Sequence, residues 1–248
     1  MDTSLVEPLL VLFQSYPSEL LSVILLLFCC GAIILLLRFY GVYGLYVYNA
    51  VAIIAANIQV LKLSYFPFWG EPLALGTIVF ATTYLVSDIL TELYGKKVAK
   101  DGVWLCFGAQ VLFTVMMLLT LAHAPAAEDT THGAMAILFT PSLRLFISSL
   151  AAFAISQMFD IWVFQKIRQL TNSRRLWLRT IFSFLLAGFI DNVVFSFLAW
   201  YLLSPEPLGI GDIWNRYVFG TYTARILVAA ISLPTIYYCR HIKRPTNA

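Results

Sequence analysis

The amino-acid sequence predicts an all-α membrane protein, a polytopic bundle of seven transmembrane helices. Of its 248 residues, 60% are hydrophobic and only 12% are charged, with a mean hydropathy of +0.83. These values lie far from the averages of soluble domains. Apolar runs of about 20 residues recur along the chain, and each can cross a hydrocarbon layer of roughly 30 Å at 1.5 Å per residue. We therefore expect the lipid bilayer to surround most of the chain.

The first predicted helix spans residues 20–37. Asp2, Glu7 and Glu19 precede it, and no Lys or Arg occurs before Arg38. A signal peptide requires a basic start, a shorter apolar core and a cleavage site made of small residues. The segment is therefore predicted to be retained as a membrane span.

Six further spans follow, separated by polar, aromatic or basic connections. They are predicted over residues 41–61, 72–94, 103–122, 143–167, 177–203 and 214–239. The longest polar connection covers residues 123–140, and Pro234 is predicted to kink the last span. No shift in composition marks a second domain. We thus divide the chain into an additional N-terminal helix (1–40), a six-helix core (41–240) and a short tail (241–248).

The distribution of Lys and Arg predicts the orientation of the bundle. Of the 16 basic residues, Arg225 lies inside a span, and Lys62, Arg144 and Arg216 fall on one side of the membrane. The remaining twelve fall on the other side, which also holds the C-terminus. Because Lys and Arg concentrate in cytoplasmic connections, we predict an N-terminus outside and a cytoplasmic C-terminus.

The sequence predicts no metal site, no cofactor and no enzymatic activity. The four cysteines lie in or beside apolar runs without a Cys-x-x-Cys pair, and the three histidines are expected near helix ends or in loops. An enzyme embedded in the membrane, the remote alternative, would need a nucleophile beside a base. No long basic run resembles a nucleic-acid-binding surface. No Gly-x-x-x-x-Gly-Lys-[Ser/Thr] motif is present, so any ATP hydrolysis would require a partner protein.

Two carboxylates four residues apart, Asp88 and Glu92, lie on one face at the end of the third predicted span. A charge in hydrocarbon is costly, so an acid inside a span indicates ligand or proton binding. Glu92 is expected near the cytoplasmic surface, as a partner for Lys96 at the favourable i to i+4 spacing or as a gate residue. Asp88 lies one turn deeper and is a candidate site residue.

Other polar side chains are predicted at similar depths. Gln157 and Asp160 lie one turn apart in the fifth span, Asp191 near the middle of the sixth, and Arg225 within the seventh. Arg225 could pair with Asp191 or Asp160 and only hold helices together. One arginine cannot neutralise three aspartates, however, so two carboxyl groups must be protonated, solvated or bound to a ligand.

Amides and aromatic residues add to this set. Asn49 and Asn57 lie roughly on one face of the second span, either as interhelical hydrogen-bonding groups or as ligand contacts. Tyr84 and Tyr222 each lie one turn from a charged candidate and could stack on a ligand or only fill the core. A carboxylate can accept two parallel N–H bonds from the edge of a guanine-like base. The set therefore permits a flat ligand rich in hydrogen-bonding groups.

Three stretches together resemble a known family. They are residues 87–99 (SDILTELYGKKVA), 156–164 (SQMFDIWVF) and 176–179 (LWLR), with Asp191 downstream. In combination they are similar to the queuosine precursor transporter family, the vitamin uptake transporter group of bacterial inner-membrane proteins. The similarity covers about residues 45–240. It implies a six-helix core resembling the substrate-binding subunits of energy-coupling-factor vitamin transporters. It also implies import of 7-deazaguanine bases, such as queuine or the aminomethyl and cyano precursors, for tRNA modification.

The resemblance gives the candidate site a specific hypothesis. The positions that match the family motifs are Asn57, Asp88, Gln157, Asp160, Asp191 and Arg225. We expect Asp191, Gln157 and either Asp88 or Asp160 to hold the base near the midplane, while Arg225 orients one acid. Two departures stand out: the first helix is additional to six, and Arg225 occupies a position where the family also has Lys.

The expected partners are a small 7-deazapurine base and the bilayer, with no nucleic acid, and the sequence is compatible with a homo-oligomer. The carboxylate excess predicts a preference for precursors that carry a protonated amine over the neutral cyano compound. The alternative is a substrate-binding subunit that transports only with ATPase and scaffold subunits.

Overall fold

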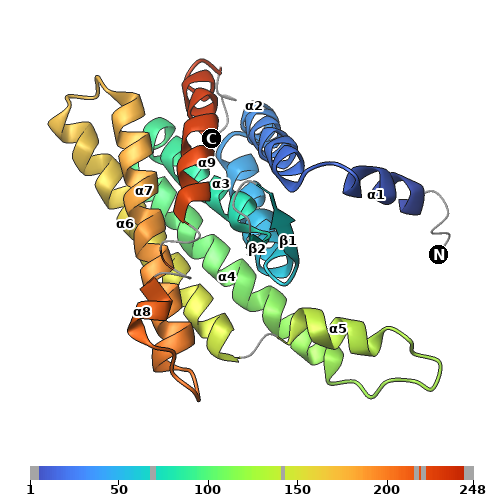
Figure 1. The fold of residues 1–248 in the computed structure, drawn as a ribbon. Coiled ribbons are helices and arrows are strands. Elements are labelled where there is room, and N and C mark those ends of the chain that lie inside the picture. Colours follow the sequence, from blue (N-terminus) through green and yellow to red (C-terminus); the bar gives the residue numbers. More distant parts are fainter. Residues whose placement is uncertain (1–5, 68–70, 141–142, 215–217, 219–221, 243–248) are drawn as a thin grey trace.

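The computed structural model describes residues 6–67, 71–140, 143–214, 218 and 222–242. Long helices pack side by side, one small hairpin caps part of the bundle, and α1 projects away from it (Figure 1). The elements are α1 (Val6–Gln14), α2 (Ser18–Gln59), β1 (Leu63–Phe66), β2 (Glu71–Ala74), α3 (Thr77–Leu93), α4 (Lys96–Leu121), α5 (His132–Phe139), α6 (Leu143–Leu170), α7 (Leu176–Phe197), a π-helical segment (Leu198–Leu202), α8 (Ile210–Asp212) and α9 (Tyr222–Cys239).

Four helices in the described part of the chain are long and apolar enough to cross a membrane: α2, α4, α6 and α7 with its π-helical extension. The predicted all-α membrane fold is therefore confirmed. α3 has 17 residues, and the apolar part of α9, Val228–Cys239, is also shorter than the four long helices. The number of seven spans stays a prediction.

α2 consists of two arms that meet at Gly41. This glycine has φ 58° and ψ −133°, a conformation that residues with a Cβ rarely adopt. A Cβ added at Gly44 would lie 2.3 Å from the carbonyl oxygen of Leu36, so the backbones of the two arms approach closely there. The bend lies at the predicted boundary between the spans 20–37 and 41–61.

Three predicted boundaries are wrong. The third span was expected from residue 72, but β2 pairs antiparallel with β1, and α3 begins only at Thr77. The expected loop over residues 123–140 contains α5, and α4 begins at Lys96 instead of residue 103. Hydropathy reports the apolar length of a segment, whereas basic residues at an interface can extend a helix beyond that length. The predicted start of the last span, residue 214, is followed by residues that lie outside the described part of the chain.

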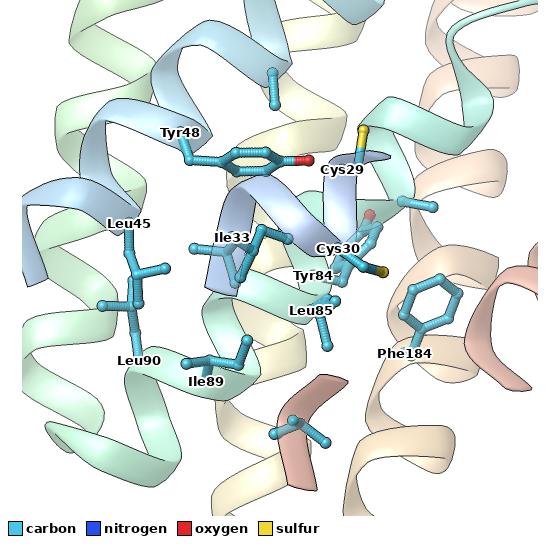
Figure 2. Packing of buried hydrophobic residues seen from close by; sticks show 14 of the residues in the cluster. Cys29, Cys30, Ile33, Leu45, Tyr48, Tyr84, Leu85, Ile89, Leu90 and Phe184 are labelled. Atoms are coloured by element: carbon cyan, nitrogen blue, oxygen red, sulfur yellow. The ribbon is translucent and has the colours of Figure 1, made fainter. Parts of the chain in front are cut away.

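α3 is the central helix of the bundle. Twelve of its 17 residues are buried, and it contacts α2, α4, α6, α7 and α9. Its apolar residues Leu85, Ile89 and Leu90 lie among side chains of α2, and Tyr84 lies beside Phe184 of α7 (Figure 2). Because α3 is surrounded by protein, its polar side chains must find partners on neighbouring helices.

α6 and α7 form an antiparallel pair that brings their polar faces together. The turn between them places Asn172 (φ 48°) and Ser173 (φ 61°) in the left-handed region, so the chain reverses within a few residues. The two helices then pack along much of their length (Figure 1). The Gln157–Asp160 segment of α6 is thereby placed opposite the polar residues of α7.

Candidate functional site

Polar side chains on one face of α3 define three layers along the bundle axis. Tyr84, Asp88 and Glu92 are spaced by four residues, so successive layers lie about 6 Å apart along α3. Each of the three side chains contacts polar groups on other helices, as described below. We name these levels the Tyr84, Asp88 and Glu92 layers.

The Tyr84 layer contains a buried ion pair between α7 and α9. Arg225 Nη2 donates to Asp191 Oδ2 at 2.6 Å, and both residues are less than one tenth exposed. Ser156 of α6 donates to Asp191 Oδ1 at 3.4 Å, and the Tyr84 hydroxyl donates to Ser156 Oγ at 2.9 Å. Of the two acids that the sequence offered to Arg225, the structure selects Asp191. The carboxylate of Asp191 is thus oriented directly from α6 and α9.

Aromatic rings and a glycine surround the Arg225 guanidinium. Its Cζ lies 5.7 Å from the centroid of the Phe80 ring. A Cβ added at Gly188 would lie 3.1 Å from both Cδ and Nη1 of Arg225, so the α7 backbone passes directly beside this side chain. Phe80 also makes edge contacts with Tyr84 and Phe153. The layer therefore combines a carboxylate with aromatic faces of the kind that stack on planar rings.

Gln157 lies beside this layer and is fully buried. Its Oε1 accepts a hydrogen bond from Ser87 Oγ at 2.5 Å, and its Nε2 donates to Thr83 Oγ1 at 2.7 Å. The amide therefore holds α6 against α3. A primary amide offers two N–H groups and two lone pairs, so one of each stays available for a ligand.

The Asp88 layer brings two carboxyl groups together. Ser183 Oγ of α7 lies 3.2 Å and 3.5 Å from the two carboxylate oxygens of Asp88, to which it donates. Asp160 of α6 interacts electrostatically with Asp88 and lies beside the Ser183 hydroxyl. Both aspartates are fully buried, and neither oxygen of Asp160 makes a hydrogen bond of normal geometry in the described part of the structure.

The Glu92 layer is a cluster of one acid and three arginines. Glu92 lies 2.7 Å from Arg179, 3.4 Å from Arg240 and 3.9 Å from Arg168. The expected partner of Glu92 was Lys96, and the structure provides these arginines instead. Arg179, one of the twelve basic residues assigned to the cytoplasmic side and the last of the basic stretch 166–179, is fully buried on α7 with its Cζ 5.3 Å from the ring centroid of Phe164.

Asn57 is the one candidate that lies apart from these layers. Its Oδ1 accepts a hydrogen bond from Ser149 of α6 at 3.0 Å, and its Nδ2 donates to the Ile53 carbonyl at 2.9 Å. Ser149 precedes Ser156 by seven residues, about 10 Å along α6. Of the two roles that the sequence left open for this amide, the observed contacts are those of an interhelical connection.

Sequence reasoning did not single out Ser156 and Ser183 as site residues, although both contact candidate aspartates. A signal was present in their spacing. Ser156 lies one turn before Asp160 on α6, and Ser183 lies two turns before Asp191 on α7, so each serine shares a helix face with an acid. A serine alone in an apolar span is too common to indicate a site.

The Tyr84 and Asp88 layers are closed to solvent in this structure, since their acids and Arg225 are less than one tenth exposed, whereas the Glu92 layer reaches the surface through Arg168 and Arg240, which are 31% and 45% exposed. A surface hollow of about 450 Å³ lies elsewhere, between the end of α4 and α5, where Thr120, His123 and Met135 line it. The residues of the Tyr84 and Asp88 layers thus form an occluded set inside the bundle.

Comparison with known proteins identifies the family. The family model described as "Putative vitamin uptake transporter" matches residues 74–239. A protein of Bacillus subtilis (strain 168) named "Probable queuosine precursor transporter" is 32% identical over 206 residues, which cover 83% of this chain and 87% of that protein. The chain belongs to the queuosine precursor transporter family. The predicted resemblance is thereby confirmed, and the chain is a multi-pass membrane protein of a transporter family.

Two more distant members share the name. A Haemophilus influenzae protein called "Probable queuosine precursor transporter" is 24% identical over 158 residues, 63% of either chain. The "Queuosine precursor transporter" of Escherichia coli (strain K12) is 22% identical over 210 residues, 81% of this chain and 86% of its own. No solved structure gives a significant match. The stretch matched by the family model contains every residue of the three layers except Arg240, and it excludes α1, α2 and Asn57.

Proposed function

We propose that this member of the queuosine precursor transporter family imports 7-deazaguanine bases, such as queuine or its aminomethyl and cyano precursors, for tRNA modification. The names of its relatives support a queuosine precursor as the transported compound. The observation that carries the proposal is the buried Asp191 carboxylate, held by Arg225 and Ser156 beside aromatic rings. This arrangement suits a planar base with N–H groups along one edge.

Recognition would use the carboxylate as a double acceptor. The ring N–H and the exocyclic amine of a guanine-like edge can donate two parallel hydrogen bonds to the two oxygens of Asp191. Each oxygen accepts one hydrogen bond in the structure, from Ser156 or Arg225, and keeps a further lone pair. Gln157 would supply the N–H and the lone pair that Ser87 and Thr83 leave free.

Charge would then discriminate among precursors. Arg225 neutralises Asp191, whereas no arginine or lysine makes an ion pair with Asp88 or Asp160 among the described residues. The site as a whole therefore carries an excess of carboxylate. Precursors with a protonated amine, such as queuine and the aminomethyl compound, would bind more tightly than the neutral cyano compound.

Uptake of labelled queuine by cells that lack their own route tests the proposal. Asp191→Asn keeps the size of the side chain but offers only one acceptor oxygen. We expect at least a roughly tenfold loss of uptake, because a charge-assisted hydrogen bond contributes ~1.5 kcal/mol or more. Asp101→Asn, at an exposed position of α4, is the matched control and should leave uptake unchanged. Full activity of Asp191→Asn would contradict the proposed contact.

Competition in the same uptake assay tests the preference for precursors with an amine. Unlabelled queuine and aminomethyl precursor should compete with labelled queuine more strongly than the cyano compound does, and equal competition would contradict the charge argument.

Transport by the purified chain alone in liposomes separates an independent importer from a substrate-binding subunit, which would bind the base but require ATPase and scaffold subunits to move it.

A further inference from the structure

The Asp88 layer holds a second set of acids, one helical turn from the layer of the Asp191 carboxylate to which the base is proposed to donate its N–H groups. Asp88 and Asp160 interact electrostatically in the interior of the bundle, and both are fully buried. The charged or titratable groups that face them are Glu92 and Tyr84 of α3 and Arg179 of α7. Arg179 donates its short hydrogen bond to Glu92 at 2.7 Å rather than to either aspartate. Arg179 acts on Asp88 electrostatically but makes its ion pair with Glu92, so neither aspartate has an ion-pair partner among the described residues.

Electrostatics requires this pair to bind a proton. Two ionised carboxylates that act on one another out of water, with no ion-pair partner among the described residues, are strongly disfavoured, so the pair binds one proton. The hydrogen bonds indicate where the proton resides. Ser183 donates to Asp88 at 3.2 Å and stabilises its ionised form, whereas the same hydroxyl lies beside Asp160 without a hydrogen bond of normal geometry, and neither oxygen of Asp160 has another donor among the described residues. Asp160 is thus the protonated partner in the occluded structure.

We propose that Asp160, paired with Asp88, is the binding site of a proton that is carried inward with each substrate molecule. This inference rests on the proposed import function. An O–H bond forms at Asp160 when a hydronium ion on the outside transfers its proton, and the same bond breaks when the proton passes to water on the cytoplasmic side. The proton moves down its electrochemical gradient and thereby drives the base against the concentration gradient of the base.

The positions of the two sites provide the coupling. α6 carries Ser156 in the Tyr84 layer, Gln157 beside it and Asp160 one turn further on, and α3 carries Tyr84 and Asp88 in the same order. Gln157 is hydrogen-bonded to α3 on one side and would contact the base on the other. A base that draws Gln157 toward Asp191 would therefore shift α6 relative to α3 and change the distance between Asp160 and Asp88. Binding of the base and binding of the proton would affect one another through this helix pair.

Purified protein in liposomes tests the coupling, with labelled queuine as the substrate and a pH-sensitive dye inside. With acid outside, the unaltered chain should accumulate queuine above equilibrium, and entry of queuine should acidify the interior. Asp160→Asn imitates a permanently protonated group. It should lose both accumulation and acidification, while exchange of labelled for unlabelled queuine persists at a reduced rate because one carboxylate near the base is neutral. Asp160→Glu restores a titratable group and should regain both.

The possible results separate this inference from the proposed function. Exchange of queuine by the unaltered chain without any effect of the pH gradient would overturn proton coupling and leave import standing. Accumulation driven by a sodium gradient at equal pH would show that sodium, and not the proton, is the coupling ion. Gradient-driven accumulation by Asp160→Asn would overturn the assignment to Asp160. Absence of queuine exchange in the unaltered chain would overturn the proposed function and, with it, this inference.

Discussion

At the scale of single residues, the ion pair between Asp191 and Arg225 is the contact on which the candidate site depends. Both partners are buried, and the Nε and Nη1 atoms of Arg225 make no hydrogen bond in the described part of the structure. A guanidinium with unused donors in a dry interior is costly unless another contact compensates. The ring of Phe80 and the neighbouring Asp191 charge are the compensating contacts that the structure provides.

Removing one partner of this pair should cost more than removing both. Arg225→Met leaves the Asp191 carboxylate buried without a cation, and we expect a loss of about 3–5 kcal/mol in stability, as for other broken buried pairs. Arg225→Met combined with Asp191→Asn should recover much of that stability without recovering uptake. The measurement is the midpoint of thermal unfolding of the purified chain in detergent, with uptake in cells alongside. Equal stability of the single and double variants would show that the pair does not depend on its charges.

A substitution at Gly188 tests how closely the guanidinium of Arg225 must be positioned against α7 for transport. A Cβ at this position would lie 3.1 Å from Cδ and Nη1 of Arg225, so Gly188→Ala should displace the side chain by a few tenths of an ångström. We expect reduced uptake at an unchanged amount of protein in the membrane. Gly108→Ala is the control, because a Cβ at Gly108 meets no atom within 4 Å. Uptake that is the same in both variants would contradict the predicted need for close placement.

At the scale of elements, the Glu92 layer connects the ends of four segments. Glu92 of α3 contacts Arg168 of α6, Arg179 of α7 and Arg240 directly after α9. Lys and Arg of the surrounding connections favour the cytoplasmic side for this end of the bundle. One glutamate thus holds together the helix ends that would have to separate if a base left the Asp191 level toward that side.

Replacing Glu92 should therefore lower the stability of the protein more than replacing the exposed Arg240. Glu92→Gln leaves the fully buried Arg179 without an anion, and we expect about 3 kcal/mol of destabilisation. Arg240→Gln removes a partner that is 45% exposed and should cost only about 0–1 kcal/mol. Thermal unfolding of the two purified variants gives the comparison. A larger loss in Arg240→Gln would mean that Arg179 does not depend on Glu92.

At the scale of the whole molecule, hydropathy predicted the membrane fold because apolar length is a local property of the sequence. Which helices become neighbours depends on residues far apart in the sequence, and this explains the contacts that sequence analysis did not predict. Asp191 and Asp160 were equal candidates for Arg225 until the packing of α7 against α9 decided between them. Arg179 was assigned to a connection because it lies near the start of an apolar run, and only the fold shows its burial against Glu92. The hairpin of β1 and β2 was missed because four-residue strands leave no periodic signal.

Orientation in the membrane is a further property of the whole chain. The excess of Lys and Arg on one side predicts that Thr131 faces outside and Asn172 faces the cytoplasm. The four native cysteines are buried, so a single added cysteine should react with little background. We expect an impermeant thiol reagent applied to intact cells to label Thr131→Cys and not Asn172→Cys. Labelling of the second variant alone would reverse the proposed topology.

The enclosure of α3 has a consequence for the way the chain enters the membrane during synthesis. At 17 residues, α3 is about 26 Å long, and it carries Asp88 in its buried face. Such a segment partitions poorly into lipid by itself, and the side chains that receive its polar groups, Gln157 and Ser183, are translated later. We expect α3 to be held stably only after α6 and α7 emerge. In chains truncated before residue 143, a cysteine introduced at the buried position Val86 should therefore react with a water-soluble thiol reagent, whereas in chains extended to residue 203 it should not; equal protection in both would show that α3 inserts unaided.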